Sequence, residues 1–446
     1  MRALVAWKNS RRRKPLVVRG ARQVGKTYLL KDFGASEFPN AHYVNFEEDD
    51  KLALLFGHDL RPRRILDELQ FHVGKRIDAQ ADLVVFDEIQ RCPRALTSLK
   101  YFCEEMPRLA VCAAGSLLGV CMGQEAFPVG KVAFLDLWPM SFEEFIEGIG
   151  ESQLAHLLAS HDPRRPYPEA AHERLWILWK QYLVVGGLPE AVNTYRLHRD
   201  NMFAAMEEAR RCQRDLVDTY MADIARHSGK MNALHIERLW RHVPAQLARA
   251  QDGSAPKFRF RDALPGMRGY ERLSGPIGWL ESAALVLRVA VLDSVATPLS
   301  SVAKDNAFKL YLFDVGILGA LGGIAPKTIL DYGFGSYQGY VAENFVAQEL
   351  CAAGFKHPYS WQGRTSEVEF LVETGKSIVP LEVKSGMVTK SKSLGVYERL
   401  HHPSQAWLLS ARNSARHGIR QHAPLYAAGR MCDHIGTTSQ SQGTAR

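Results

Sequence analysis

The residues best suited to chemistry in this sequence form a glycine-rich segment near the N-terminus. GARQVGKT at 20–27 matches the pattern GxxxxGK[ST], follows an apolar run and opens a helix-like run. Gly20 and Gly25 let the backbone curl so that its N–H groups point at phosphates, and the helix N-terminus adds positive potential. Lys26 is expected to reach the β and γ phosphates of ATP, and Thr27 to offer its hydroxyl to Mg²⁺. A plain glycine-rich turn before a helix is the alternative.

Two carboxylates that follow another apolar run would complete such a site. The run at 83–86 is wholly apolar, and Asp87 and Glu88 come directly after it. Asp87 would orient the hydrated Mg²⁺, and Glu88 would accept a proton from the attacking water. A third apolar run ends just before Ser116, whose hydroxyl would either hold that water or serve as a turn or N-cap residue. Solvated loop acids are the alternative interpretation of the two carboxylates.

A second group of acids and an amine lies near the C-terminus. Glu382 and Lys384 share one face of a strand-like run at 378–384, because side chains alternate along a strand. A tight turn at 374–377 would bring Glu369 alongside them from the preceding strand-like run. Two carboxylates and an amine at a hairpin could bind a divalent metal and aim water at a phosphodiester. They could also form an exposed cross-strand ion pair.

The elements that must position the glycine-rich segment alternate through the first 115 residues. Strand-like runs cover 15–19, 41–46, 83–86 and 109–114, and helix-like runs cover 26–33, 65–73 and 96–103. Wholly apolar strands that alternate with helices are typical of a parallel sheet covered on both faces. The sequence therefore predicts the α/β fold class, with a phosphate-binding parallel-sheet core.

The rest of the chain has a different pattern. Helix-like runs cover 150–215, 221–247 and 277–287, with an interruption at 186–189. Strand-like runs at 287–292 and 308–313 follow short helices, which suggests a winged-helix module. From 340 the order is helix, three strands, helix, strand, and the polar last residues are expected to be disordered.

Composition and charge exclude several classes of protein. The chain has 446 residues, 46% hydrophobic and 23% charged, which excludes one small domain and the collagen-like, coiled-coil and wholly disordered classes. A formal charge of +8 favours an anionic partner. Its 7 cysteines form no CxxC pair and its 16 histidines no matched ligand pair, so we expect neither a disulfide framework nor a structural metal. Because no apolar run reaches the length of a membrane helix, we expect a cytoplasmic protein without a membrane segment.

Several motifs together resemble the AAA-superfamily ATPases that carry a C-terminal domain of unknown function. They are GARQVGKT (20–27), VVFDEIQR (84–91), AAGSLLG (113–119), LWPMSFEEF (137–145), GGLPEAV (186–192) and KLYLFDVGIL (309–318). The resemblance covers nearly the whole chain and implies an ATP-binding core, a small helical region and a winged-helix segment. It does not identify the arginine finger, for which Arg91, Arg94 and Arg108 are candidates beside the alternative of ordinary surface arginines.

The elements from 340 onward are similar to the PD-(D/E)xK nuclease fold, which has an acid on its second strand and ExK on its third. That resemblance implies that Glu369 and Glu382 are metal ligands and that Glu343 is an accessory ligand. Lys384 would position water or stabilise charge. The second-strand acid is usually Asp, and Glu369 is one methylene longer, which alters the metal geometry. Such folds also occur as inactive binding modules.

These patterns lead to a predicted division of the chain and to competing functions. The parts are a basic leader (1–14), an AAA-type ATPase domain (15–150), a helical lid (151–215), a helical and winged-helix segment (216–330), a nuclease-like domain (331–432) and a disordered tail (433–446). The leading hypothesis is ATP hydrolysis coupled to a nuclease-like or winged-helix module on DNA or RNA. The alternative is a nucleotide-dependent switch that binds a protein partner and has an inactive nuclease-like domain. A sequence-specific DNA-binding regulator is a third hypothesis, and a homo-oligomer stays open.

A basic segment is the predicted contact for an anionic partner. Seven basic side chains lie between 241 and 272 against three acids, namely Arg241, Arg249, Lys257, Arg259, Arg261, Arg268 and Arg272. We expect this segment to contact phosphates, with a solvated basic face as the alternative.

Overall fold

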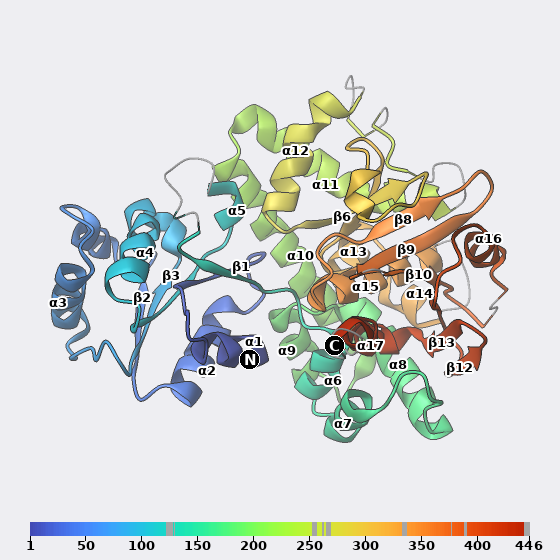
Figure 1. The fold of residues 1–446 in the computed structure, drawn as a ribbon, viewed down its shortest axis with the longest axis horizontal. Coiled ribbons are helices and arrows are strands. Elements are labelled where there is room, and N and C mark those ends of the chain that lie inside the picture. Colours follow the sequence, from blue (N-terminus) through green and yellow to red (C-terminus); the bar gives the residue numbers. More distant parts are fainter. Residues whose placement is uncertain are drawn as a thin grey trace, which may run out of the picture. The chain divides into compact units, whose positions relative to one another are not determined.

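The structure is a computed structural model that describes residues 1–121, 128, 130–251, 257–260, 263–264, 269–331, 337–375, 377–387 and 390–440. The chain forms two compact units (Figure 1). The first is Met1–Trp138 with Ser282–Ala284, and the second is Pro139–Glu281 with Leu285–Arg446.

The first unit is built on a five-stranded sheet in the order β2-β3-β4-β1-β5 (Figure 1). Its strands are β1 (Leu16–Arg19), β2 (Ala41–Asn45), β3 (Leu83–Asp87), β4 (Ala110–Ala114) and β5 (Ala133–Asp136). Its helices are α1 (Arg2–Lys8), α2 (Lys26–Glu37), α3 (Pro62–Val73), α4 (Pro93–Glu105) and α5 (Leu118–Cys121), with 3-10 turns at Asp50–Phe56 and Ile89–Arg91. Every strand pair is parallel, which confirms the predicted α/β class.

Two apolar clusters cover the two faces of this sheet. Alternate strand residues enter different clusters, as Val17 and Val84 do on one face and Leu16 and Val85 on the other. Leu4 and Trp7 of α1 belong to the second cluster. A three-residue spacing puts both side chains on the face of α1 that packs into the core, and the separation of a leader at 1–14 stays a prediction.

Helices make up the first part of the second unit. They are α6 (Phe142–Gly148), α7 (Ser152–Ser160), α8 (Glu169–Val185), α9 (Pro189–Leu197), α10 (Met202–His227), α11 (Lys230–Gln251) and α12 (Tyr270–Ser282). Phe142 and Phe145 of α6 pack their rings against Tyr182 of α8, with centroids 5.7 and 5.2 Å apart. The first compact unit ends at Trp138, because the aromatic side chains of α6 are buried in the second unit, and the end of the ATPase domain at 150 stays a prediction.

An eight-stranded sheet forms the rest of the second unit, in the order β12-β13-β11-β10-β9-β8-β6-β7. The strands are β6 (Val286–Leu292), β7 (Phe308–Leu312), β8 (Tyr359–Gln362), β9 (Glu367–Thr374), β10 (Ser377–Val383), β11 (Ala406–Ser410), β12 (Ala415–His417) and β13 (Arg420–Pro424). The helices are α13 (Val315–Leu321), α14 (Pro326–Asp331), α15 (Tyr337–Ala352), α16 (Lys392–His401) and α17 (Ala428–Gln440), with 3-10 turns at Leu299–Ser301 and Leu425–Ala427.

This sheet crosses the expected boundary between 330 and 331. The β6–β7 hairpin, expected to be the wing of a winged helix, pairs in parallel with β8 through Ala290 and Tyr359. The segments expected to be a winged helix and a nuclease-like domain therefore contribute strands to one sheet, and the predicted division between them stays a prediction. The outer side of an edge strand leaves backbone N–H and C=O groups unpaired. The pairing of β6 with β8 satisfies such groups on both strands.

The first part of the expected disordered tail at 433–446 belongs to a helix in the structure. α17 continues to Gln440, with Met431, Cys432 and Ile435 buried on one face. Their spacing of three to four residues is that of an amphipathic helix. The last part of the expected tail, at 441–446, lies outside the described residues.

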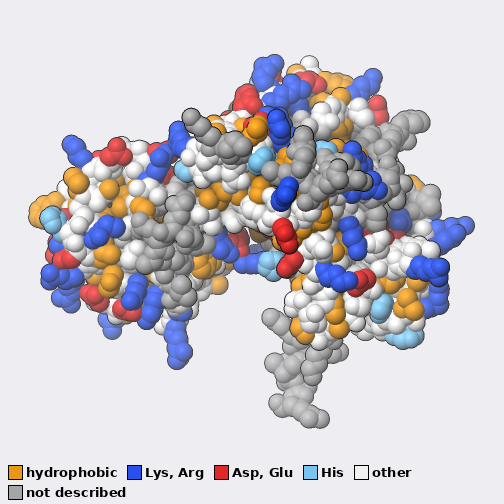
Figure 2. Space-filling model, turned by 90° about the horizontal axis from the view of Figure 1, so that it is seen from above, with side chains coloured by type: hydrophobic (Ala, Val, Ile, Leu, Met, Phe, Trp, Pro, Cys, Tyr) orange, Lys and Arg blue, Asp and Glu red, His pale blue; other side chains and the backbone are white. Residues whose placement is uncertain are grey.

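Lys and Arg side chains are spread over the face of the molecule that Figure 2 shows, with Asp and Glu side chains between them. Within the described residues, no helix combines the length and the apolar character that crossing a membrane requires.

Candidate nucleotide site and acid–amine cluster

The glycine-rich loop joins β1 to α2 in a conformation that only particular residues tolerate. Gly25 has φ 94° and Gln23 has φ 60°, both in the left-handed region. A Cβ atom on Gly20 would lie 2.1 Å from the carbonyl oxygen of Leu137, which follows β5. Gly20 is therefore required by a close backbone approach, and Gly25 by its positive φ at the N-cap of α2.

Lys26 folds back over this loop. Its Nζ donates to the carbonyl oxygens of Gly20 at 3.1 Å and Ala21 at 2.7 Å, and only 6% of the residue is exposed. Burial lowers the pKa of the amine to about 8, while Glu88 and Asp87 act in the opposite direction. The ammonium stands where a phosphate oxygen would replace the two carbonyls as its partner.

Asp87 joins three donors at the end of β3. Its Oδ2 accepts from the hydroxyl of Thr27 at 2.6 Å and from the hydroxyl of Tyr43, and its Oδ1 accepts from the backbone N–H of Glu88 at 2.9 Å. Burial and the neighbouring Asp87 raise the pKa of Tyr43 above its usual range. A hydroxyl and a carboxylate in contact beside the loop are oxygen donors of the kind that Mg²⁺ prefers, so these residues fit the cation.

Sequence analysis missed Tyr43, which comes from β2. Its neighbours Val44 and Asn45 lie beside Phe86 and Asp87 in the parallel register, so β2 ends next to the acidic end of β3. The parallel pairing of the runs at 41–46 and 83–86 is the signal that could have found it.

Glu88 and Ser116 are connected by a residue that sequence analysis also missed. The amide of Gln90 donates to Glu88 Oε2 and, at 3.3 Å, to Ser116 Oγ. Glu88 has φ 50°, a conformation that costs free energy outside glycine and is often retained at functional sites. A Cβ atom on Gly115 would lie 2.2 Å from Gln90 Oε1, so a glycine at this position leaves room for the amide.

Two of the three arginine-finger candidates have partners in their own chain. Arg91 pairs with Glu47 at 2.6 Å, and Arg94 donates to the backbone carbonyls of Phe56 and His58, the latter at 3.2 Å. Arg94 thereby holds the end of the turn that precedes α3. Arg108 accepts through its carbonyl oxygen from Arg13. The assignment of a finger stays a prediction.

The structure brings together the predicted acids and amine of the C-terminal part. Lys384 Nζ lies 2.6 Å from Glu382 Oε1 and 3.8 Å from Glu369 Oε1. Glu369 Oε2 also accepts from the backbone N–H of Val383 at 3.2 Å. β9 and β10 are antiparallel neighbours, so the hairpin produces the convergence that strand alternation predicts.

Within this cluster Glu382 is buried, while Glu369 and Lys384 are partly exposed. Glu382 is 1% exposed, and its Oε2 has no hydrogen-bond partner in the described part of the chain. Burial and then the nearby Glu382 raise the pKa of Glu369 well above its usual value, against the effect of Lys384. Across the residues that the structure describes, no group of three or more acids, histidines or cysteines is arranged to hold a metal ion. The metal-ligand roles of Glu343, Glu369 and Glu382 therefore stay predictions.

Two residues of β7 extend the cluster beyond those that sequence analysis selected. Lys309 Nζ lies 3.4 Å from Glu343 Oε2 on α15 and 2.5 Å from Glu367 Oε1 on β9. Tyr311 donates its hydroxyl to Glu343 Oε2 at 2.7 Å. Both were missed because β7 was assigned to a separate winged-helix module. Their alternation in KLYLF puts them on one face of β7.

Three of the sequence motifs meet at a second buried site. Asp314 Oδ2 accepts from the N–H of Gly187 at 2.7 Å, and the Met140 N–H donates to the Gly187 carbonyl at 2.7 Å. Tyr182 donates its hydroxyl to the Met140 carbonyl at 2.6 Å. A Cβ atom on Gly187 would lie 2.1 Å from that same carbonyl oxygen. Residues from LWPMSFEEF, GGLPEAV and KLYLFDVGIL thus serve packing of the second unit.

The predicted basic segment is described only in part. Arg241, Arg259 and Arg272 are exposed, and Arg241 pairs with Glu237 at 3.1 Å. Arg261 and Arg268 lie outside the described residues. The phosphate contacts expected of this segment stay a prediction.

The fold and the site together define a P-loop nucleotide hydrolase. A glycine-rich loop runs from a central parallel strand into a helix, and Thr27 of that helix contacts a buried acid at the end of a nearby strand. Residues 12–146 match the family model of the AAA domain. Residues 177–328 match a domain of unknown function, DUF8612, and residues 338–424 match another, DUF4143. The N-terminal part of the chain therefore carries an AAA-type ATPase domain, and the C-terminal part carries a DUF4143 domain.

Solved structures similar to this chain have low identity. The Walker-type ATPase of Pyrococcus abyssi is 16% identical over 72% of this chain and 93% of its own, with a TM-score of 0.44. PCH-2 of C. elegans is 13% identical over 46% of this chain and 63% of its own, with a TM-score of 0.27. Drosophila ORC bound to DNA is 16% identical over 70% of this chain and 90% of its own, with a TM-score of 0.28. No curated protein matches the chain.

Proposed function

We propose that the chain hydrolyses ATP at the loop of 20–27 and uses this reaction to control a nucleic-acid-directed C-terminal domain. Lys26 binds the β and γ phosphates, and Glu88 accepts a proton from the attacking water. Thr27 and Asp87 would hold Mg²⁺, which supplies positive charge against the phosphates. Gln90 keeps Glu88 and Ser116 together, because its amide donates to both.

The observation that carries the nucleic-acid part is the convergence of Glu369, Glu382 and Lys384. Glu369 lies on β9 and Glu382 on the neighbouring strand β10, and Lys384, directly after β10, contacts both carboxylates. Two acids and an amine at one point are suited to phosphodiester hydrolysis, in which the amine stabilises charge that develops on the phosphate. A divalent cation bound by the two acids would supply an activated water.

One assay tests this function. The full chain is mixed with labelled DNA or RNA, with and without ATP and with Mg²⁺ or Mn²⁺, and phosphate release and strand cleavage are measured in the same sample. Glu369→Ala, Glu382→Ala and Lys384→Ala should each abolish cleavage and leave phosphate release unchanged. Cleavage that survives all three substitutions would show that this cluster is not the nuclease site.

A second function is favoured by the charge balance of the same cluster. The ammonium of Lys384 contacts both carboxylates, and no metal-holding group of three is present among the described side chains. An ammonium that already neutralises the acids suits an inactive nuclease-like domain that binds a protein partner when the nucleotide state changes. Phosphate release without metal-dependent cleavage of any nucleic acid would favour this switch.

A further inference from the structure

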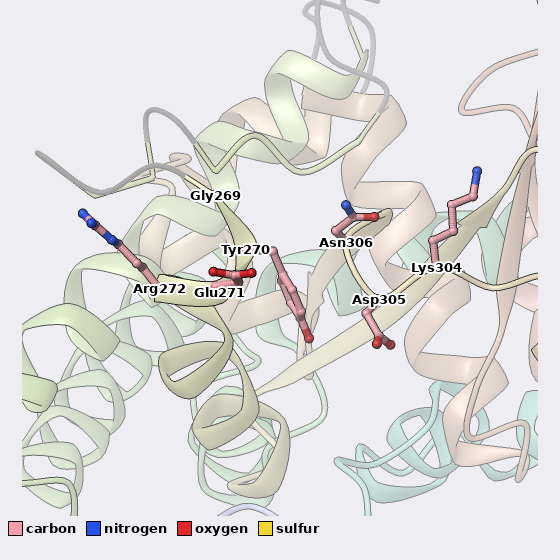
Figure 3. Close-up of a pocket in the computed structure, with 7 residues that line it drawn as sticks. All are labelled: Gly269, Tyr270, Glu271, Arg272, Lys304, Asp305 and Asn306. Carbon is pink, nitrogen blue, oxygen red and sulfur yellow. The ribbon is translucent and has the colours of Figure 1, made fainter.

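The second unit contains an open cavity that is not lined by residues of the acid–amine cluster. Its volume is about 950 Å³. The start of α12 and the turn before β7 line it, through Gly269, Tyr270, Glu271, Arg272, Lys304, Asp305 and Asn306 (Figure 3). Small-molecule sites commonly have volumes of roughly 300 to 1,000 Å³, so the space suffices for one nucleotide.

An aromatic ring is held in this cavity by its neighbours. The centroid of the Tyr270 ring lies 5.8 Å from Phe260 and 6.1 Å from Phe308. The guanidinium of Arg288 lies 4.4 Å from the Phe308 centroid and 5.7 Å from the Tyr270 centroid. In Figure 3 the Tyr270 side chain extends between Glu271 and Arg272 on one side and Asn306 and Asp305 on the other. The ring is thus fixed before any ligand arrives, which reduces the entropy lost on stacking.

Cations and polar groups surround this ring. Arg272 and Lys304 are exposed at the two sides of the cavity (Figure 3). Lys304 pairs with Asp293, and Arg272 has no ion-pair partner among the residues that the structure describes. The amide of Asn306 and the carboxylates of Glu271 and Asp305 offer both donors and acceptors.

The neighbouring backbone connects the cavity to the predicted basic segment. The N–H of Phe258 donates to the carbonyl of Phe308 at 2.8 Å, so the short stretch 257–260 lies beside β7. Lys257 and Arg259 flank Phe258 in the sequence. Two further basic residues are thus placed in the stretch that lies beside the edge strand β7.

We propose that this cavity binds one unstacked nucleotide of a single-stranded nucleic acid. The base stacks on Tyr270, its edge bonds to Asn306, Asp305 or Glu271, and Arg272 and Lys304 contact the flanking phosphates. An aromatic platform bordered by cations is the usual means of binding single strands without a fixed sequence, whereas a duplex keeps its bases stacked and inaccessible. The inference rests on the proposed function in that the partner is a nucleic acid.

Fluorescence anisotropy of a labelled single strand of about 12 nucleotides with the full chain tests it. Tyr270→Ala should weaken binding roughly 5- to 100-fold, and Tyr270→Phe should restore it because the ring is kept. Arg272→Gln should reduce the slope of log affinity against log salt by about 0.7. Phe71→Ala is the matched control, because Phe71 is an aromatic residue of α3 that is 89% exposed and lies in the first unit. A duplex of the same sequence should respond little to Tyr270→Ala.

The outcomes separate this site from the proposed function. If the Tyr270→Ala chain binds the single strand as tightly as the unchanged chain does, the cavity is not the nucleotide-binding site. That result would leave a nucleic-acid function of the chain in place. The Lys26→Ala chain, in which nucleotide binding at the phosphate loop is weakened, is then titrated with free AMP. Displacement of the strand by AMP would show that the cavity binds a free nucleotide, and it would overturn the proposal of single-strand binding. Absence of all nucleic-acid binding at low salt overturns both proposals. An ATP hydrolysis rate that Tyr270→Ala leaves unchanged shows that the variant is folded.

Discussion

Lys26 is the residue on which nucleotide binding is predicted to depend most directly. Its ammonium bonds to the carbonyl oxygens of Gly20 and Ala21, which hold it over the phosphate loop. Lys26→Ala should therefore weaken ATP binding at least tenfold, because the charge that meets the β and γ phosphates is lost. Titration with a fluorescent ATP analogue measures this. Lys100→Ala, at an exposed position on α4, is the control and should bind as the unchanged chain does. Equal affinity in both variants would contradict the placement of the phosphates.

Residue types and spacing selected the motif residues of the candidate nucleotide site but not the side chains that contact them. Lys26, Thr27, Asp87 and Glu88 come from contiguous motifs, so a local pattern suffices to select them. Tyr43 and Gln90 depend on which strands are neighbours and on a turn after β3, and neither follows from a short motif. The same is true of Lys309, whose partners Glu343 and Glu367 lie on α15 and β9.

At the scale of elements, the first unit follows its local sequence closely. β1, β3 and β4 were predicted because each contains a short apolar run that is buried in the sheet, whereas β2 alternates buried residues with more exposed ones. β5 was missed because its residues are half-exposed or exposed and it pairs only with β1. The pairing of β6 with β8 was also missed, since it joins parts of the chain that are distant in sequence and lack a local signal.

Close packing between α8, α9 and the segment before α6 makes Gly187 intolerant of a side chain. A Cβ atom there would meet the Met140 carbonyl oxygen at 2.1 Å, and a backbone oxygen cannot rotate away. Gly187→Ala should lower the free energy of unfolding by about 1 to 3 kcal/mol. Thermal melting followed by circular dichroism measures it. Gly275→Ala is the matched control, because a Cβ atom at Gly275 in α12 meets nothing within 4 Å. A Gly187→Ala chain as stable as the Gly275→Ala chain would contradict this packing.

Helix α15 carries a buried carboxyl group whose ionisation opposes folding. Glu349 is 3% exposed and its Oε1 accepts from the N–H of Phe142 at 3.0 Å. Burial raises the pKa of Glu349 from 4.5 to about 8, with Glu144 and Glu143 adding to the increase. Between these two values the unfolded chain has lost the proton and the folded chain keeps it. Stability contributed by this group is therefore present below pH 4.5 and is lost as the pH rises toward 8.

Glu349→Gln should remove that part of the pH dependence. The glutamine keeps an oxygen for the N–H of Phe142 and carries no charge, so the melting temperature of the variant should rise relative to the unchanged chain between pH 5 and 8. The difference in free energy should grow by up to about 1.4 kcal/mol per pH unit. Melting curves at four pH values in that range measure it. Parallel curves for the two chains would contradict the raised pKa.

On the scale of the whole molecule, charge is the feature that links the sequence to an anionic partner. Lys and Arg number 56 against 48 acids, and the excess is scattered apart from the segment at 241–272. Reversal of three exposed members of that segment, in the combined variant Arg241→Glu, Arg259→Glu and Arg272→Glu, should weaken DNA binding. Its dependence on salt should also become shallower, because fewer phosphate counterions are released. Anisotropy titrations at several salt concentrations measure both, and an unchanged salt slope would show that the segment is a solvated face.

Phosphate release from ATP by the Glu88→Gln chain is the most direct test of ATP hydrolysis with Glu88 as the base. Glu88 lies beside Asp87 at the end of β3 and is held toward Ser116 through Gln90. Glutamine keeps the size of the side chain and removes the base, so ATP should bind with nearly unchanged affinity while hydrolysis falls by about 10² to 10⁴. Phosphate release at saturating ATP and Mg²⁺, measured beside the unchanged chain, gives this ratio. If the Glu88→Gln chain hydrolysed ATP at the unchanged rate, Glu88 would not be the base that accepts a proton from the attacking water.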